Sequence, residues 1–71
     1  MLRYTVAIEK ANGNYSAYCP DSPGCAATGS SVKETTERIR EAIEFHIEGL
    51  KAEGLEVPPP GTTAALVEAA V

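Results

Sequence analysis

The chain has 71 residues, of which 10 are acidic and 6 are basic, and its net charge at pH 7 is -4. A chain this short buries only about 60% of its unfolded surface, so we expect a single domain over residues 1–71 with a thin core. Such a domain gains burial by self-association, which favours a homo-oligomer, a dimer or a tetramer. The negative charge repels phosphate backbones, so a basic protein partner is favoured and direct nucleic-acid binding is not expected.

The sequence shows no pattern of a signal peptide or a membrane span. Its first residues lack a basic stretch followed by an apolar one, and no apolar run approaches the roughly 18 residues that a span requires. We therefore expect a cytoplasmic protein in which Cys19 and Cys25 stay reduced. With His46 they supply three of the roughly four ligands of a structural zinc site, so neither a metal nor a cofactor is expected.

A hairpin is predicted at the N-terminus. Residues 2–10 alternate between apolar and polar side chains, which is typical of a half-buried strand, and a second strand covers residues 14–19. Asn12 and Gly13 between them favour a type I′ turn. A two-residue turn sets the apolar sides of both strands on one face, with these pairs opposite each other: Lys10 and Tyr15, Ile8 and Ala17, Val6 and Cys19.

A third strand and a long helix follow the hairpin. The loop from Pro20 to Gly24 redirects the chain, and residues 25–28 form the third strand. Ser31 and Glu34 have the spacing of a capping box, which starts a helix over residues 32–53, and Gly54 ends it.

The helix has two contrasting faces and one aromatic side chain between them. The apolar face, predicted to lie on the sheet, contains Val32, Thr36, Ile39, Ala42, Ile43, His46, Ile47 and Leu50. A ridge of acidic side chains lies opposite and contains Glu34, Glu37, Glu41, Glu44 and Glu48. Phe45 falls between the acidic ridge and the flank that carries Ala42 and Gly49, so we expect it to be exposed.

The last segment admits two interpretations. Pro58, Pro59 and Pro60 cannot continue a helix and favour an extended chain. The alanines beyond Gly61 favour helix, although the segment is short for one. We predict a short fourth strand over residues 64–67.

The order of these features resembles the HicB-like antitoxin N-terminal domain family over nearly the whole chain. The resemblance is carried by Tyr4, Val6, Ile8 and Glu9, by Gly13, Tyr15 and Ala17, by Pro20-Asp21 and Pro23-Gly24-Cys25, and by Gly29, Ser31 and Glu34. Further matches are Ala42, Ile43, His46, Leu50, Gly54, Pro58 and Pro60. Ser22 stands where the family commonly has an apolar residue, and Thr35 where it commonly has alanine.

The resemblance implies an α+β fold of order βββαβ, an antiparallel sheet with one long helix packed on one face, similar to a partial RNase H-like sheet without its metal-binding carboxylates. It also implies a partner, a small basic HicA-like toxin that cleaves messenger RNA, which the antitoxin would neutralise by covering its active surface. Many HicB proteins continue into a DNA-binding segment, and this chain ends at Val71, so operator binding is not expected.

Two surfaces are candidates for these contacts. The partner-binding residues are predicted to be Asp21, Ser22, Pro23 and Gly24 of the loop and Glu37, Glu41, Glu44 and Glu48 of the helix. The alternatives are that the glutamates are only a solvated face and that Asp21 forms an Asx turn. The predicted oligomer contact contains Phe45, Tyr18 and Ala7, although a lone exposed aromatic is also normal.

No catalytic site is predicted. The cysteines are interpreted as small buried hydrophobes, and His46 as an imidazole at the boundary of sheet and helix, hydrogen-bonded to a loop carbonyl. Glu9 and Asp21 are the only carboxylates near the sheet, so a residual metal-dependent nuclease is the less favoured alternative. The other alternative to an antitoxin is a stand-alone oligomeric module with a different partner. We expect a binding module and not an enzyme.

Overall fold

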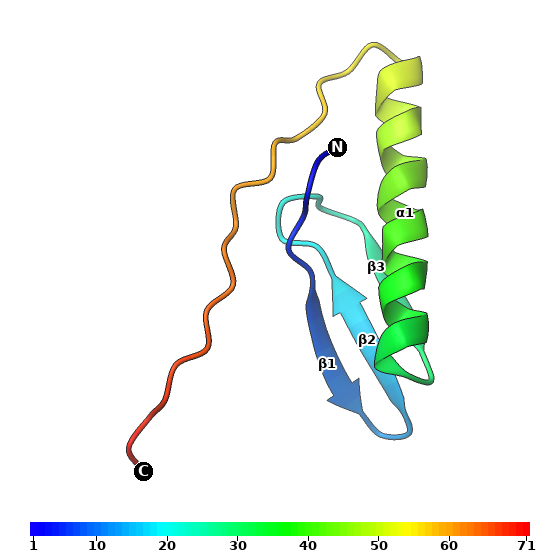
Figure 1. Cartoon of the computed structure of the whole chain (residues 1–71). Coiled ribbons are helices and arrows are strands. Elements are labelled where there is room, and N and C mark those ends of the chain that lie inside the picture. The colour runs from blue at the N-terminus through cyan, green and yellow to red at the C-terminus, as the bar shows by residue number, and fades with distance from the viewer.

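The structure, a computed structural model, describes all residues from 1 to 71 (Figure 1). Strands β1 (Ala7–Ala11), β2 (Asn14–Tyr18) and β3 (Ala26–Gly29) form one antiparallel sheet in the order β1-β2-β3. Helix α1 (Val32–Ala52) follows and packs on one face of this sheet. These elements confirm the predicted α+β fold of three antiparallel strands and one long helix.

The hairpin turn determines the register of β1 and β2. Gly13 has a φ of 78°, as the turn requires, and Lys10 pairs with Tyr15 and Ile8 with Ala17, as predicted. The predicted pair of Val6 and Cys19 is wrong, because the ladder ends where Ala7 meets Tyr18. Strand β2 stops there as the chain enters the Pro20 loop, so residues 2–6 have no strand to pair with and β1 is shorter than the predicted 2–10.

The ends of α1 are determined by local hydrogen bonds. The Ser31 hydroxyl oxygen accepts a hydrogen bond from the Glu34 backbone N–H at 3.0 Å, as a capping box requires. The Glu34 carboxylate accepts from the backbone N–H of Ser30 at 2.8 Å, one residue earlier than in the standard motif. At the other end Gly54 has a φ of 70°, which confirms it as the residue that stops the helix.

The core is small and lies between β2, β3 and the middle of α1. Its fully buried apolar side chains are Ala17, Cys19, Cys25, Ile39 and Ile43, so both cysteines are buried as interpreted. Val32 and Thr36 of the predicted apolar face are exposed. Thr35 is buried in their place, and its hydroxyl donates to the Ser31 carbonyl oxygen at 2.7 Å.

The predicted fourth strand is absent. The chain after α1 runs down the β1 side of the sheet, away from the helix (Figure 1), and residues 61–71 are exposed without regular structure. The Tyr4 hydroxyl donates to the Pro58 carbonyl oxygen at 2.6 Å, and the Thr5 hydroxyl to that of Thr62 at 2.8 Å. Because these contacts come from side chains, no backbone ladder forms beside β1. The partial RNase H-like sheet stays a prediction.

Candidate partner-binding surface

The loop between β2 and β3 is closed by its own backbone. The Cys19 backbone N–H donates to the Cys25 carbonyl oxygen at 3.3 Å, and the Ser22 backbone N–H donates to the Cys19 carbonyl oxygen at 3.2 Å. Ser22 is only 1% exposed, and its Oγ lies 3.1 Å from the Cys25 Sγ. This burial corrects the prediction that Ser22 meets a partner, since the turn directs its hydroxyl inward. Pro23 and Gly24 form the exposed tip of the loop.

Asp21 binds the C-terminal segment of the same chain. Its Oδ2 accepts hydrogen bonds from the backbone N–H groups of Gly61 at 2.9 Å and Thr62 at 2.8 Å, and its Oδ1 accepts from the Thr62 hydroxyl at 2.9 Å. The Gly61 bond, followed by the two Thr62 bonds, holds the pKa of Asp21 below its ordinary value. Both carboxylate oxygens accept hydrogen bonds from the C-terminal segment, which corrects the alternative of a local Asx turn, and contact of Asp21 with a partner stays a prediction.

This clamp predicts that acid releases the C-terminal segment. Because the folded pKa of Asp21 is lowered, the clamp is fully present above the ordinary value of 3.8 and is lost as the pH falls through the lower folded value. Asp21→Ala should release the segment at neutral pH as well. Amide hydrogen exchange at Gly61 and Thr62 measures this, and we expect it to accelerate at least severalfold in Asp21→Ala, with Glu9→Ala as the control. Equal exchange in wild type and Asp21→Ala would contradict the clamp.

Four glutamates of α1 have no intramolecular partner. Glu34 is different, because its carboxylate bonds Ser30 and lies 3.7 Å from the Arg38 guanidinium. The Ser30 bonds and then the charge of Arg38 hold the pKa of Glu34 below its ordinary value. The exposed carboxylates without a hydrogen bond or ion pair are Glu37, Glu41, Glu44 and Glu48, and we call them the glutamate ridge. These are the helix residues predicted to bind a partner.

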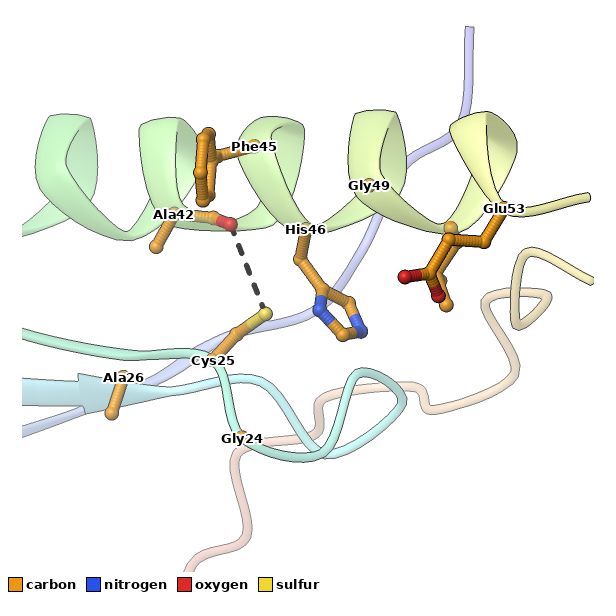
Figure 2. Close-up of a pocket in the computed structure, with 9 residues that line it drawn as sticks. Gly24, Cys25, Ala26, Ala42, Phe45, His46, Gly49 and Glu53 are labelled. Carbon is orange, nitrogen blue, oxygen red and sulfur yellow. Dashed lines mark hydrogen bonds between the residues drawn. The ribbon is translucent and has the colours of Figure 1, made fainter. Parts of the chain in front are cut away.

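A hollow of about 440 Å³ lies between α1 and the start of β3 (Figure 2). Phe45, which is 79% exposed as predicted, lies beside it on the helix. His46 points from the helix into the hollow and is half-buried, but it makes no hydrogen bond, so the predicted bond to a loop carbonyl is wrong. The Cys25 Sγ is buried against Ser22 and the Ala42 carbonyl oxygen, at 3.1 and 4.0 Å, and this contact shields the thiol from solvent.

The other predicted oligomer contacts lie on the sheet. Ala7 pairs with Tyr18, and Tyr18 pairs with Ala26, so the three residues form one row across the strands. Tyr18 is exposed, and Ala26 lines the same hollow as Phe45. The Ala26 side chain points away from the helix (Figure 2), so the row lies on the outer face of the sheet, whereas Phe45 lies on α1.

A second groove, which the sequence pattern did not reveal, lies between the N-terminal segment and α1. It has a volume of about 630 Å³, and its apolar lining includes Tyr4, Val6, Ile39, Ile43 and Ile47, with Arg40, Glu44 and Lys51 among the polar lining residues. The groove exists because the core sits mainly under β2 and β3, whereas the side chains before β1 cover the helix incompletely. The hydrophobic pattern of the helix gives its apolar face but not how much of that face the sheet covers.

The carboxylates considered for nuclease chemistry are not gathered around one point. Glu9 is exposed on β1, and Asp21 is occupied by the C-terminal segment. No group of three or more His, Cys, Asp and Glu side chains is placed to hold a metal ion. Helix α1 is also not apolar enough to cross a membrane.

The sequence profile of the HicB-like antitoxins of bacterial toxin-antitoxin systems matches residues 4–70. The chain belongs to the HicB-like antitoxin family. Its fold is similar to that of a chain in the solved HicA3 and HicB3 toxin-antitoxin complex, with a TM-score of 0.70 and 33% identity, over 83% of this chain and 70% of the other.

The chain is also similar to two proteins whose names state no function. A UPF0150 protein of Synechocystis is 46% identical over 82% of this HicB-like chain and 75% of its own length. An uncharacterised 14.9 kDa protein of Haemophilus phage HP1 is 42% identical over 80% of this chain, which spans 43% of the phage protein. The HicB-like domain is thus found both as most of a short protein and as part of a longer one.

Proposed function

We propose that this HicB-like chain neutralises a basic HicA-type toxin in the cytoplasm by covering the surface with which the toxin cleaves messenger RNA. The observation that carries the proposal is the match, at 33% identity over 83% of the chain, to a chain of a solved toxin-antitoxin complex. The family assignment over residues 4–70 supports it. The proposed role is one of binding, and the burial of the Cys25 thiol supports it.

The glutamate ridge is the proposed docking surface for the toxin. Its four carboxylates are exposed and have no intramolecular partner, so they are available to basic side chains of another protein. A net charge of -4 raises the rate of encounter with a basic protein and disfavours direct contact with RNA. The exposed loop tip, Pro23 and Gly24, is proposed as a second part of this surface.

The test is a titration of the toxin's RNA cleavage with matched antitoxin variants. The toxin is the small basic HicA-type protein that we expect to be encoded next to this chain. The ridge variant carries Glu37→Gln, Glu41→Gln and Glu48→Gln, and the control variant carries Glu9→Gln, Glu56→Gln and Glu68→Gln, all at exposed positions. Both variants therefore lose the same charge.

We expect the ridge variant to inhibit cleavage about tenfold more weakly than wild type, because three exposed ion pairs contribute roughly 0.2–1 kcal/mol each. The control variant should inhibit nearly as well as wild type. Equal inhibition by both variants would exclude the ridge as the docking surface. A chain that neither binds nor inhibits the toxin would contradict the antitoxin function and favour an oligomeric module with another partner.

A further inference from the structure

The two cysteines lie directly opposite each other at the base of the loop that joins β2 and β3. The last pair of this ladder is Tyr18 and Ala26, and the same register continued by one residue pairs Cys19 with Cys25. The Cys19 backbone N–H donates to the Cys25 carbonyl oxygen at 3.3 Å, so the pair is formed. Both side chains are buried in the core cluster, which places them on the same face of the sheet.

This arrangement is close to the geometry of a disulfide. Residues in a hydrogen-bonded antiparallel pair have Cα atoms about 5.5 Å apart, and disulfides most often join Cα atoms about 5.5–6 Å apart. Their Cβ atoms lie about 4.5–5.5 Å apart, whereas a disulfide needs about 3.5–4.5 Å. Cys19 and Cys25 lie just beyond the ends of β2 and β3, so the loop backbone can supply this small approach while the ladder stays paired.

The hollow beside α1 gives access to one of the two sulfurs. Cys25 lines the hollow of about 440 Å³ and is 6% exposed, whereas Cys19 is 3% exposed and is not among the lining residues. Figure 2 shows the Cys25 side chain pointing from the sheet toward the helix. Because Ser22 and the Ala42 carbonyl oxygen shield this sulfur, it reacts when its side chain turns into the hollow. An oxidant in the hollow therefore meets Cys25 first.

We propose that Cys19 and Cys25 are a redox-active pair that forms a reversible intramolecular disulfide, with a low-molecular-weight disulfide as the oxidant. The Cys25 thiolate attacks one sulfur of the oxidant and breaks its S–S bond, so that a mixed disulfide forms and one small thiol leaves. The Cys19 thiolate then attacks the Cys25 sulfur and releases the second small thiol. The two released thiols take up the two cysteine protons, and the oxidant takes up the two electrons.

The geometry favours a bond that is easily reversed. A disulfide whose atoms must be drawn together is more readily reduced than an unstrained one, and disulfides in reducing compartments are usually transient and redox-sensing. The pair is therefore a dithiol at rest and is oxidised when small disulfides accumulate. This site goes beyond toxin neutralisation and does not depend on it.

The bond loosens the loop at Ser22. The buried Ser22 Oγ lies 3.1 Å from the Cys25 Sγ and has no other hydrogen-bond partner. When the sulfur turns toward Cys19, this hydroxyl is left buried and unpaired, which is unfavourable. The turn then opens so that the hydroxyl reaches water. The Ser22 backbone N–H, which donates to the Cys19 carbonyl oxygen at 3.2 Å, reports this opening.

Intact mass of the purified full chain treated with oxidised glutathione tests the proposal. Wild type should lose the mass of two hydrogen atoms and stay a single chain, and a reducing agent should reverse the change. Cleavage at Asp21, which lies between the only two cysteines, should leave the fragments joined. A wild type that keeps both thiols, that forms the bond only in urea, or that links two chains would overturn the proposal.

Two variants test the order of the reaction, with far-UV circular dichroism to verify that each is folded. Cys19→Ser should stop at a glutathione adduct on Cys25, because the second thiol is missing. Cys25→Ser should form an adduct at least about tenfold more slowly, since Cys19 does not line the hollow. Equal rates in the two variants would contradict Cys25 as the first thiol.

Amide hydrogen exchange of the reduced and oxidised wild type tests the effect on the loop. We expect exchange at the Ser22 amide to accelerate at least severalfold on oxidation, while the Ile39 amide in the buried part of α1 is the control and stays unchanged. Unchanged exchange at Ser22 would contradict the opening of the turn. Acceleration at both amides would show that the bond disrupts the whole fold and would overturn the proposal of a local switch.

Discussion

Ile39→Ala should lower the free energy of unfolding by about 2–5 kcal/mol, the range for removing a fully buried large aliphatic side chain. Ile39 is the largest fully buried side chain of the chain, and it belongs to a core of only five buried apolar residues. A domain of this size has a total stability of about 4–11 kcal/mol at 0.05–0.15 kcal/mol per residue. The substitution therefore removes a large share of it.

Urea denaturation of wild type and Ile39→Ala at one protein concentration measures this loss, because self-association makes apparent stability depend on concentration. Val32→Ala is the control, since Val32 belongs to the same predicted apolar face but is half exposed. We expect the control to shift the free energy of unfolding by less than about 1 kcal/mol. Equal losses at both positions would show that the core does not lie under the middle of α1.

Gly29→Ala should lower the free energy of unfolding by about 1–3 kcal/mol through overpacking. A Cβ at Gly29 would lie 2.6 Å from the Thr35 Oγ1 and 2.9 Å from the Thr35 backbone nitrogen. The second contact is with the backbone of α1, so a change of the Thr35 rotamer cannot relieve it. The end of β3 and the first turn of α1 would have to separate.

The control for this prediction is Gly61→Ala, where a Cβ meets nothing within 4 Å and φ is not positive. It should change the free energy of unfolding by no more than about 0.5 kcal/mol. Thermal unfolding followed by circular dichroism separates the two outcomes. If Gly29→Ala unfolds at the temperature of wild type, β3 and α1 do not meet as closely as described.

Local signals in the sequence were sufficient for much of the fold. The turn at Asn12 and Gly13 determined the register of the hairpin, as the pair of Ile8 and Ala17 confirms. Ser31 and Gly54 marked the two ends of α1, because a hydroxyl cap and a left-handed glycine act within a few residues of the chain. Phe45 was correctly expected to be exposed from its angular position on the helix.

Contacts between distant segments could not be predicted in this way. Asp21 stands in a turn-forming sequence, and nothing local indicates that it binds Gly61 and Thr62. The fourth strand was wrong for a related reason, since β-propensity describes a segment but not whether a backbone partner lies beside it. Thr35 was not predicted in the core because threonine is polar. In the structure its hydroxyl donates a hydrogen bond to the Ser31 carbonyl oxygen in the preceding turn, which allows the side chain to be buried.

The central claim is that the glutamate ridge of this HicB-like chain docks a basic toxin. The most direct test is to map the amide chemical shifts of the labelled chain during titration with its HicA-type toxin. We predict that the largest changes occur at the amides of Glu37, Glu41, Glu44 and Glu48 and at the Gly24 amide, which represents the loop tip because Pro23 has no N–H. Changes confined to the outer face of the sheet, around Tyr18 and Thr28, would contradict the claim, as would the absence of any change at saturating toxin.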